Sequence, residues 1–239
     1  MIHEWQERTA LLVGNEALEK LASSHVIVVG LGGVGAYAAE QLCRAGVGKL
    51  TIVDGDKIDT SNRNRQLPAL VSTLGKRKAY IVAGRLKDIN PDVDLIVIDE
   101  FIKDDRMKDI LAVRYDYVVD AIDTLSPKVF LVRISLENGL RVVSSMGSGG
   151  KLDPEKIRVA DISESYNCRL ARAMRKRLHR MNINTGFKVV FSPEDVPDSA
   201  VLSPDEEMEN QKSTVGTISY MPAIFGCMCA SIVIRDIIS

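Results

Sequence analysis

Apolar runs rich in Val and Ile alternate with amphipathic segments from residue 25 to about residue 147. Short apolar runs predict buried strands, and their alternation with helices predicts a mostly parallel sheet with helices on both faces. The predicted strands are residues 25–30, 49–56, 94–99, 115–123 and 141–147. The predicted helices are residues 33–45, 73–90, 105–114 and 127–138. We therefore expect an α/β, Rossmann-like fold.

The pattern changes after Gly150, where the predicted elements become shorter. Residues 156–162 and 187–193 predict short strands on either side of a strongly basic helix at 168–181. The acidic, proline-containing segment 193–212 predicts a mobile loop. An apolar helix is predicted to follow it, and the first 25 residues are expected to form an arm and a short helix.

The composition is ordinary for a soluble globular protein, with 46% hydrophobic and 26% charged residues. A net charge of −1 provides no overall basic field, so a nucleic-acid partner would need a local patch. Residues 213–234 carry no charge, which is compatible with a buried helix or with membrane contact. Interruptions by Gly216, Pro222 and Gly226 favour a buried helix over a membrane span.

Four cysteines without a recognisable secretion signal predict a reducing, cytoplasmic location. No C-x-x-C pair occurs in the sequence, which argues against a zinc knuckle. Cys227 and Cys229 would point about 200° apart on a helix, so they cannot hold one ion together. Both are expected to be buried structural thiols.

The stretch "VIVVGLGGVG" places Gly30, Gly32 and Gly35 at the spacing of a dinucleotide-binding turn between a strand and a helix. Glycines permit the tight turn and the close approach of backbone to an anion, while the helix N-terminus offers free N–H groups to phosphate. The sequence therefore predicts a nucleotide site. A turn that only packs is the structural alternative, and the glycines do not distinguish NAD from ATP.

Charged residues beyond the second strand favour a triphosphate. Asp54 is predicted to end that strand, at the place where an acid binds ribose hydroxyls. Arg63, Arg65 and Lys78 then supply more positive charge than two phosphates held by the glycine turn require. Guanidinium and ammonium groups suit a β,γ-phosphate tail and the leaving pyrophosphate. A solvated basic surface is the alternative interpretation.

Asp123 is predicted to end the fourth strand, at the edge where open α/β sheets bind ligands. This carboxylate is a candidate Mg²⁺ ligand, whereas Asp120 is expected to be structural. None of the three histidines, His3, His25 and His179, follows a predicted strand at its carboxyl end, where an acid or base for hydride transfer is expected.

These motifs together resemble the superfamily of ubiquitin-activating-like adenylating enzymes, which includes the activators of sulfur-carrier proteins. The residues that carry the resemblance are Gly30, Gly32, Gly33, Gly35, Asp54, Asp56, Asn62, Arg65, Gln66, Lys78 and Asp123. The resemblance implies one adenylating-enzyme domain over residues 1–239. Its parts would be an arm and helix at 1–25, a nucleotide-binding core at 26–150 and a substrate and dimer portion at 151–239.

The resemblance also implies residue roles. ATP and Mg²⁺ would bind at the glycine turn, and a carboxylate would attack the α-phosphate to form an acyl-adenylate. Asp54 would hold the ribose and Asp123 the metal. Arg8 matches the arginine that reaches into a neighbouring protomer's site, which implies a homodimer. The residues implied to hold the phosphates are Asn62, Arg65 and Lys78.

Within the superfamily the chain most resembles the tRNA threonylcarbamoyladenosine dehydratase branch. "RTALLVGNEALEKL", "SSMGSGGKLDP", "IRVADI" and "CRLARAMRKRL" carry this resemblance. It implies adenylation of the threonyl carboxylate of a modified adenosine next to the anticodon, followed by ring closure. Such chemistry needs no covalent enzyme nucleophile, which agrees with the lack of a cysteine in an obvious thioester-forming loop.

Two other functions stay open. An activator of a ubiquitin-like sulfur carrier would adenylate the C-terminus of a small protein ending in Gly-Gly. A sulfur-relay protein is a further candidate partner. A nucleotide-sensing module would bind ATP without splitting it.

The basic helix is the candidate surface for tRNA phosphates on a chain of net charge −1. Arg169, Arg172, Lys176 and Arg180 recur every three or four residues and would share one face. A solvated helix face is the alternative. The acidic segment after Pro193 is an unfavourable neighbour for RNA, and either points away or acts as a gate. The full set of candidate nucleic-acid residues is Arg169, Arg172, Arg175, Lys176, Arg177 and Arg180.

Overall fold

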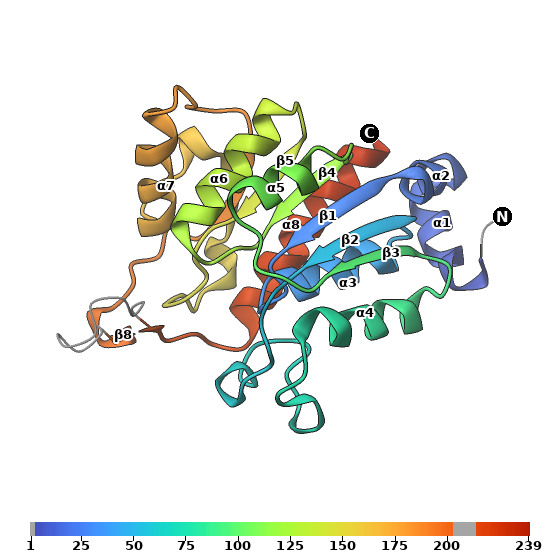
Figure 1. Ribbon diagram of the computed structural model, residues 1–239, viewed down its shortest axis with the longest axis horizontal. Helices are drawn as coiled ribbons and strands as arrows, with labels where there is room; N and C mark the ends of the chain where they lie inside the picture. The colour runs from blue at the N-terminus through green and yellow to red at the C-terminus, as the bar shows by residue number, and fades with distance from the viewer. Residues whose placement is uncertain (1–2, 203–213) are drawn as a thin grey trace.

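A seven-stranded sheet forms the centre of the molecule, in the order β3-β2-β1-β4-β5-β7-β6. The computed structural model describes residues 3–202 and 214–239. Every pair of neighbouring strands is parallel except β6 and β7. The expected α/β, Rossmann-like class is therefore confirmed (Figure 1). The strands are β1 (His25–Val29), β2 (Lys49–Val53), β3 (Asp94–Ile98), β4 (Tyr117–Asp120), β5 (Val142–Ser145), β6 (Arg158–Asp161) and β7 (Lys188–Phe191).

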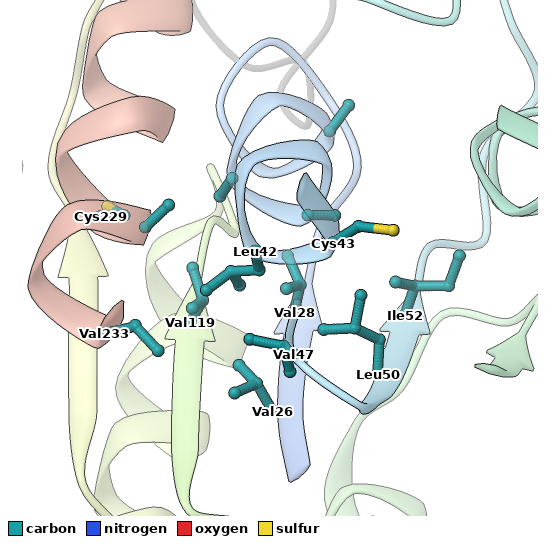
Figure 2. Packing of buried hydrophobic residues seen from close by; sticks show 14 of the residues in the cluster. Val26, Val28, Leu42, Cys43, Val47, Leu50, Ile52, Val119, Cys229 and Val233 are labelled. Atoms are coloured by element: carbon teal, nitrogen blue, oxygen red, sulfur yellow. The ribbon is translucent and has the colours of Figure 1, made fainter. Parts of the chain in front are cut away.

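Helices cover both faces of this sheet, as the apolar strands require, because neither face can be left to solvent. The face holding Val26 and Val28 of β1 packs under α3 and α8, and Figure 2 shows Leu42 and Cys229 against it. The opposite face holds Ile27 and packs under α5, α6 and α7. Alternate residues of one strand therefore serve two separate cores. The helices are α3 (Gly35–Arg44), α4 (Lys78–Ile89), α5 (Asp104–Leu111), α6 (Leu125–Glu137), α7 (Arg169–His179) and α8 (Tyr220–Ile238).

The N-terminal arm is more ordered than expected, because it forms the helix α1 (Glu7–Val13) before α2 (Asn15–Ser23). Gly14 separates the two helices with a φ of 82°. Figure 1 shows both helices beside the amino end of β1. The His3 ring lies 3.6 Å from a carboxylate oxygen of Asp92, just before β3. The arm therefore lies at the amino ends of the strands.

Several predicted boundaries differ from the structure by a few residues, and two of these differences bear on the site. The helix predicted at 73–90 begins only at Lys78, because Val71–Thr73 form a 3₁₀ turn and Gly75 has a φ of 76°. It ends at Ile89, before Pro91, as expected. The strand predicted at 115–123 ends at Asp120, which places Asp123 in the following loop.

The segment after β7 also differs from the predicted mobile loop, over residues 193–202. Asp198–Ala200 form a 3₁₀ turn, and the short strand β8 (Val201–Leu202) pairs antiparallel with β9 (Thr214–Val215). The acidic residues Asp205, Glu206, Glu207 and Glu209 lie outside the described residues.

Helix α8 packs as a core helix, with Met221, Phe225 and Cys229 buried along one side. Among the described residues it is the one helix long and apolar enough to cross a membrane, a property shared with core helices of soluble proteins. Burial raises the pKa of the Cys229 thiol to about 12, as expected for a structural thiol. The same expectation is wrong for Cys227, which is exposed because it lies half a turn away.

A buried ion pair explains where β4 ends. Lys128 of α6 and Asp120 are both fully buried, with Nζ and Oδ2 2.8 Å apart. Asp120 also accepts hydrogen bonds from the Ser144 hydroxyl at 2.5 Å and the Ile122 N–H at 3.1 Å. Lys128 Nζ donates to the Ile122 carbonyl at 3.0 Å. Asp120 therefore has the expected structural role, because its contacts hold the chain at the point where it leaves the sheet.

We expect Lys128→Met to lower the free energy of unfolding by about 3–5 kcal/mol, because it leaves a buried carboxylate without its counter-charge. The double variant Asp120→Asn/Lys128→Met removes both charges and keeps amide partners for Ser144 and Ile122. Its unfolding free energy in urea titrations should lie closer to wild type than that of Lys128→Met. A double variant as unstable as the summed single variants would contradict this account.

Candidate active site

The glycine turn lies at the carboxyl end of β1, where it meets the first residues after β4. A Cβ on Gly30 would lie 2.7 Å from the Ala121 carbonyl oxygen, and one on Gly35 would lie 1.7 Å from the Gly30 carbonyl oxygen. These two glycines are required by packing alone. Gly32 is different, since the atom nearest to a Cβ at that position would be Gln66 Nε2, at 3.7 Å. Packing does not require glycine at position 32, whereas the close approach of a nucleotide to the backbone would.

Gln66 lies beside the glycine turn and has one polar atom without a partner in the described part of the chain. Its Oε1 atom is buried and has no hydrogen-bond partner among the described residues. An unsatisfied buried acceptor costs free energy, and such atoms usually have a role. The atom of this side chain that faces Gly32 is the amide nitrogen Nε2, so Gln66 lines the space in front of the turn with a donor.

Asp54 follows β2 and ties that strand to the glycine turn. Its carboxylate accepts the Leu31 N–H at 2.7 Å with one oxygen and the Asp56 N–H at 2.7 Å with the other. Burial raises the pKa of Asp54 above its usual value, although these two hydrogen bonds oppose the shift. The Asp54 carboxylate, which is predicted to bind the ribose, is therefore already oriented at the turn.

Lys78 begins α4 and faces the same region. Its side chain is only 6% exposed, and its Nζ lies 2.9 Å from Asp56 Oδ2. The Lys78 backbone N–H donates to the Asp56 carbonyl at 3.0 Å, which fixes the start of the helix. The structure thus brings Asp54, Asp56 and Lys78 together at the end of β2, as the sequence predicts.

The polar loop after β2 holds the predicted phosphate ligands. Asn62 Oδ1 accepts the Asp59 N–H at 3.1 Å and closes a short 3₁₀ turn. Arg65 donates through one Nη to the Ser61 carbonyl at 3.0 Å and to Asn64 Oδ1 at 2.8 Å. Arg65 is half-buried, whereas Arg63 is exposed. A Cβ on Gly33 would lie 3.5 Å from Arg65 Cγ, so this loop lies beside the glycine turn.

Asp123 lies on the other side of the turn, three residues beyond the end of β4. Its side chain is exposed, and one of its oxygens accepts the Thr124 hydroxyl at 3.0 Å. Among the described residues, no three His, Cys, Asp or Glu side chains cluster to hold a metal. A metal here would therefore need ligands from a bound molecule in addition to Asp123.

Helix α7 exposes five of its six predicted basic residues and buries Ala171, Met174 and Leu178. Arg175 instead donates to the Ser165 carbonyl at 2.7 Å, so it is engaged within the fold. Arg177 donates to the Ser126 hydroxyl at 2.6 Å, at the start of α6 and three residues after Asp123. The basic surface therefore adjoins the Asp123 loop. The exposed residues of this surface are Arg169, Arg172, Lys176, Arg177 and Arg180.

Arg8 lies on α1, at the amino ends of the strands, and is exposed. The nucleotide turn lies at their carboxyl ends. Within one chain, Arg8 therefore does not join the site.

The chain matches the ThiF family over residues 6–239. The chain belongs to this family. The tRNA threonylcarbamoyladenosine dehydratase of Bacillus subtilis is 35% identical over 245 residues, which cover 100% of this chain and 96% of that protein. The enzyme of the same name from Escherichia coli is also 35% identical, over 95% of this chain and 92% of its own.

Solved structures agree. The E. coli tRNA N6-threonylcarbamoyladenosine dehydratase in complex with ATP has a TM-score of 0.88 at 33% identity, and 99% of this chain and 96% of that chain are covered. Its AMP complex has a TM-score of 0.87 at the same identity. The resemblance to adenylating enzymes inferred from the motifs is thereby confirmed.

Three contributors to this site were not found from the sequence: Lys128, Asn64 as a partner of Arg65, and the unsatisfied Gln66 oxygen. Lys128 did leave a signal, since it lies on the same helical row as the buried Val132 and Ser135. The contacts of the other two depend on loops whose paths no local pattern specifies.

Gly32→Ala and Gly35→Ala form a matched pair of variants. Gly35→Ala should lower the free energy of unfolding by about 3 kcal/mol or more, because its Cβ would collide with backbone. Gly32→Ala should leave stability within about 0.5 kcal/mol of wild type. It should nevertheless weaken ATP binding by about tenfold or more, measured by calorimetry, because the methyl group occupies ligand space. Equal destabilisation by both substitutions would favour a turn that only packs.

Proposed function

We propose that this chain is an ATP-dependent tRNA threonylcarbamoyladenosine dehydratase and that residues 1–239 act as one adenylating-enzyme domain. The observation that carries the proposal is 35% identity to an enzyme of that name across 100% of this chain. The match includes the nucleotide site and also the basic helix, which a generic nucleotide-binding fold does not require.

The reaction splits into two steps that balance. A threonyl carboxylate oxygen attacks the α-phosphorus of ATP, the bond to the bridging oxygen breaks, and pyrophosphate leaves with the electron pair. The carbamoyl group then attacks the activated carbonyl carbon, AMP leaves, and a proton is released. The tRNA has lost the elements of one water, while ATP has become AMP and pyrophosphate.

Each site residue has a role in that chemistry. Asp54 would orient the ribose, while Asn62, Arg65 and Lys78 would bind the phosphates and stabilise the leaving pyrophosphate. Lys78 forms an ion pair with Asp56, so its ammonium group is already held at the carboxyl edge of the sheet.

Mg²⁺ fits the donor set of this site, because it is commonly bound by one or two carboxylates together with substrate phosphates and water. The exposed Asp123 carboxylate would be its protein ligand. When bound, the ion would neutralise negative charge that develops on the phosphates.

The exposed basic residues of α7 would bind tRNA phosphates. Support comes from their common exposure and from Arg177, whose hydrogen bond to Ser126 places this surface beside Asp123. A tRNA backbone on α7 would therefore lie close to the loop that carries the metal ligand. The four free thiols agree with a cytoplasmic location, where tRNA is modified in a reducing environment.

A homodimer is part of the proposal. Helix α1 exposes Leu11 and Leu12, at 88% and 84%, beside Arg8. Large apolar side chains at adjacent exposed positions favour burial against another surface. A second copy seated on α1 would let Arg8 reach the partner's site.

A second candidate substrate is the C-terminus of a small carrier protein. The sulfur carrier protein ThiS adenylyltransferase of E. coli is 33% identical over 56% of this chain. The alignment leaves much of the chain unmatched, so the tRNA substrate is preferred. A sulfur-relay protein stays a partner that the family resemblance implies.

Incubation with ATP·Mg²⁺ and tRNA bearing threonylcarbamoyladenosine should yield a nucleoside lighter by one water, detected by mass spectrometry of a nuclease digest. Asp123→Ala should abolish this product with the fold intact. Lys78→Ala should slow the step roughly ten- to hundredfold by removing charge-assisted hydrogen bonds.

An unchanged nucleoside, with pyrophosphate exchange that depends on a protein ending in Gly-Gly, would favour the carrier-protein function. ATP binding without cleavage for either substrate would indicate a nucleotide sensor.

Mixing Arg8→Ala with Asp123→Ala protomers tests the trans role of Arg8. A heterodimer contains one site with both residues intact, so activity should recover from near zero towards half of wild type per heterodimer, which is about a quarter of wild type for a randomly exchanged equal mixture. Native mass spectrometry should first verify that heterodimers form. Verified heterodimers without recovered activity would contradict a trans role.

A further inference from the structure

The segments on either side of β8 and β9 form a paired ribbon, residues 194–202 and 214–219. Within it, Val201 pairs with Val215 and Leu202 with Thr214. Figure 1 shows β8 at the end of the molecule opposite α1. Both arms of this ribbon are tied to the loop that follows β5, residues 149–153.

The ribbon packs against two consecutive glycines, Gly149 and Gly150. A Cβ on Gly149 would lie 3.0 Å from Val215 Cγ1. Gly150 has a φ of 69°, and a Cβ at that position would lie 2.5 Å from Val196 Cγ1. The Gly150 N–H donates to the Gly216 carbonyl at 2.8 Å. A side chain at Gly150 would therefore collide with Val196 and strain the backbone, and one at Gly149 would press on Val215.

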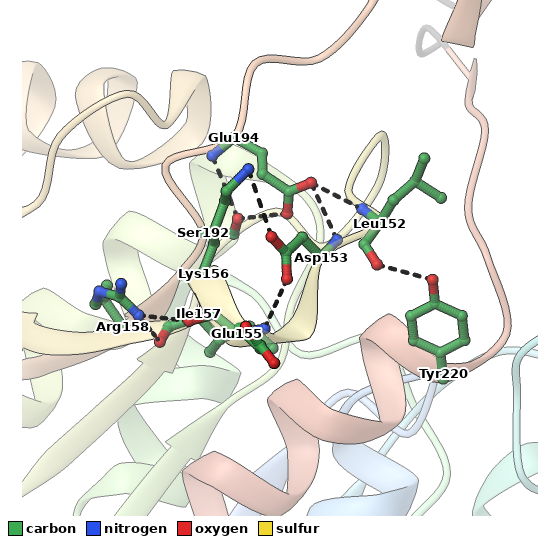
Figure 3. A network of polar contacts seen from close by, with 9 residues as sticks. All are labelled: Leu152, Asp153, Glu155, Lys156, Ile157, Arg158, Ser192, Glu194 and Tyr220. Carbon is green, nitrogen blue, oxygen red and sulfur yellow. Dashed lines mark hydrogen bonds and ion pairs between the residues drawn. The ribbon is translucent and has the colours of Figure 1, made fainter.

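Glu194 clamps the first arm onto the same loop, as Figure 3 shows. Its carboxylate accepts the backbone N–H groups of Leu152 and Asp153, each at 3.1 Å, and the Ser192 hydroxyl at 2.9 Å. The buried Lys151 donates to the Glu194 carbonyl. Burial alone would raise the pKa of Glu194, but these hydrogen bonds hold it below its usual value. The clamp is therefore ionised near neutral pH.

The second arm ends at the loop that carries Arg65. The Thr217 carbonyl accepts a hydrogen bond from Asn64 Nδ2 at 2.9 Å. The other end of the same amide, Asn64 Oδ1, accepts the Arg65 guanidinium at 2.8 Å. Only a side chain with a donor and an acceptor can bridge a carbonyl to a guanidinium in this way. Alanine lacks both groups.

We propose that Asn64 is a positioning residue. Its amide is held by the Thr217 carbonyl of the ribbon and in turn orients the Arg65 guanidinium towards the phosphates of ATP. The proposal rests on the proposed function for the phosphate-binding role of Arg65. It follows that Glu194, which holds the ribbon at its far end, supports Arg65 through the same connection. Preorganisation of a binding side chain raises affinity because less freedom is lost on binding.

The test measures the Kd of ATP·Mg²⁺ by calorimetry, in the absence of tRNA. Asn64→Ala should raise the Kd by about tenfold, the scale of one to two lost hydrogen bonds at an anion site. The same substitution in an Arg65→Ala background should change the Kd less than about twofold, because its effect passes through Arg65. The melting temperature should stay at the wild-type value, since Asn64 is exposed.

Glu194→Gln tests the far end of the connection. It should raise the Kd for ATP about two- to fivefold and should also lose this effect in the Arg65→Ala background. Glu155→Gln is the matched control, because Glu155 is exposed in the same network and should leave the Kd unchanged.

Three outcomes would overturn the proposal in distinguishable ways. Equal effects of Asn64→Ala with and without Arg65 would show that Asn64 acts independently of it. A wild-type Kd for Asn64→Ala would remove the positioning role while leaving the proposed function standing. Failure of the wild-type protein to bind ATP would overturn both.

Discussion

The buried contact between Asp120 and Lys128 organises the edge of the sheet on which the site depends. It lies where the chain, having built β2 and β3 on one side of β1, returns to build β4 and β5 on the other. Ligands of open α/β sheets bind at such a reversal. Because both charges are fully buried, each requires the other as a counter-charge. The Asp120 carboxylate also accepts the Ile122 N–H, so the chain turns away from β4 directly after Asp120. The Asp123 loop and the start of α6 take their places from this turn.

Around that edge the two halves of the chain contribute different groups. The first half supplies the glycine turn, the Asp54 carboxylate and the cations of the loop after β2. The second half supplies the basic helix and the paired ribbon, which contacts both that helix and the phosphate loop. Asp198 of the ribbon lies 3.8 Å from Arg169 of α7, while Thr217 accepts from Asn64. The ribbon therefore connects the basic helix to the loop that carries Arg65.

Sequence patterns reached most of this arrangement, and their failures have physical causes. Asp120 and Asp123 both lie in one apolar run of the sequence, but the pairing of β4 stops at Asp120, whose carboxylate accepts the Ile122 N–H. Arg175 lies in the same basic run as its neighbours, yet it turns to the Ser165 carbonyl. Cys227 and Cys229 are two residues apart, and the direction of the core decided which one is buried.

What the sequence determined by itself is what local chemistry controls. Strand and helix alternation follows from hydrophobic periodicity, and the nucleotide turn follows from glycines at a fixed spacing after a strand. Tertiary structure alone decided that Lys128 neutralises Asp120, that the Gln66 amide lies beside Gly32, and that Asn64 reaches Thr217. Asn64 and Thr217 are 153 positions apart, and such a contact depends on how loops from different strand ends meet. No periodicity within either loop encodes that meeting.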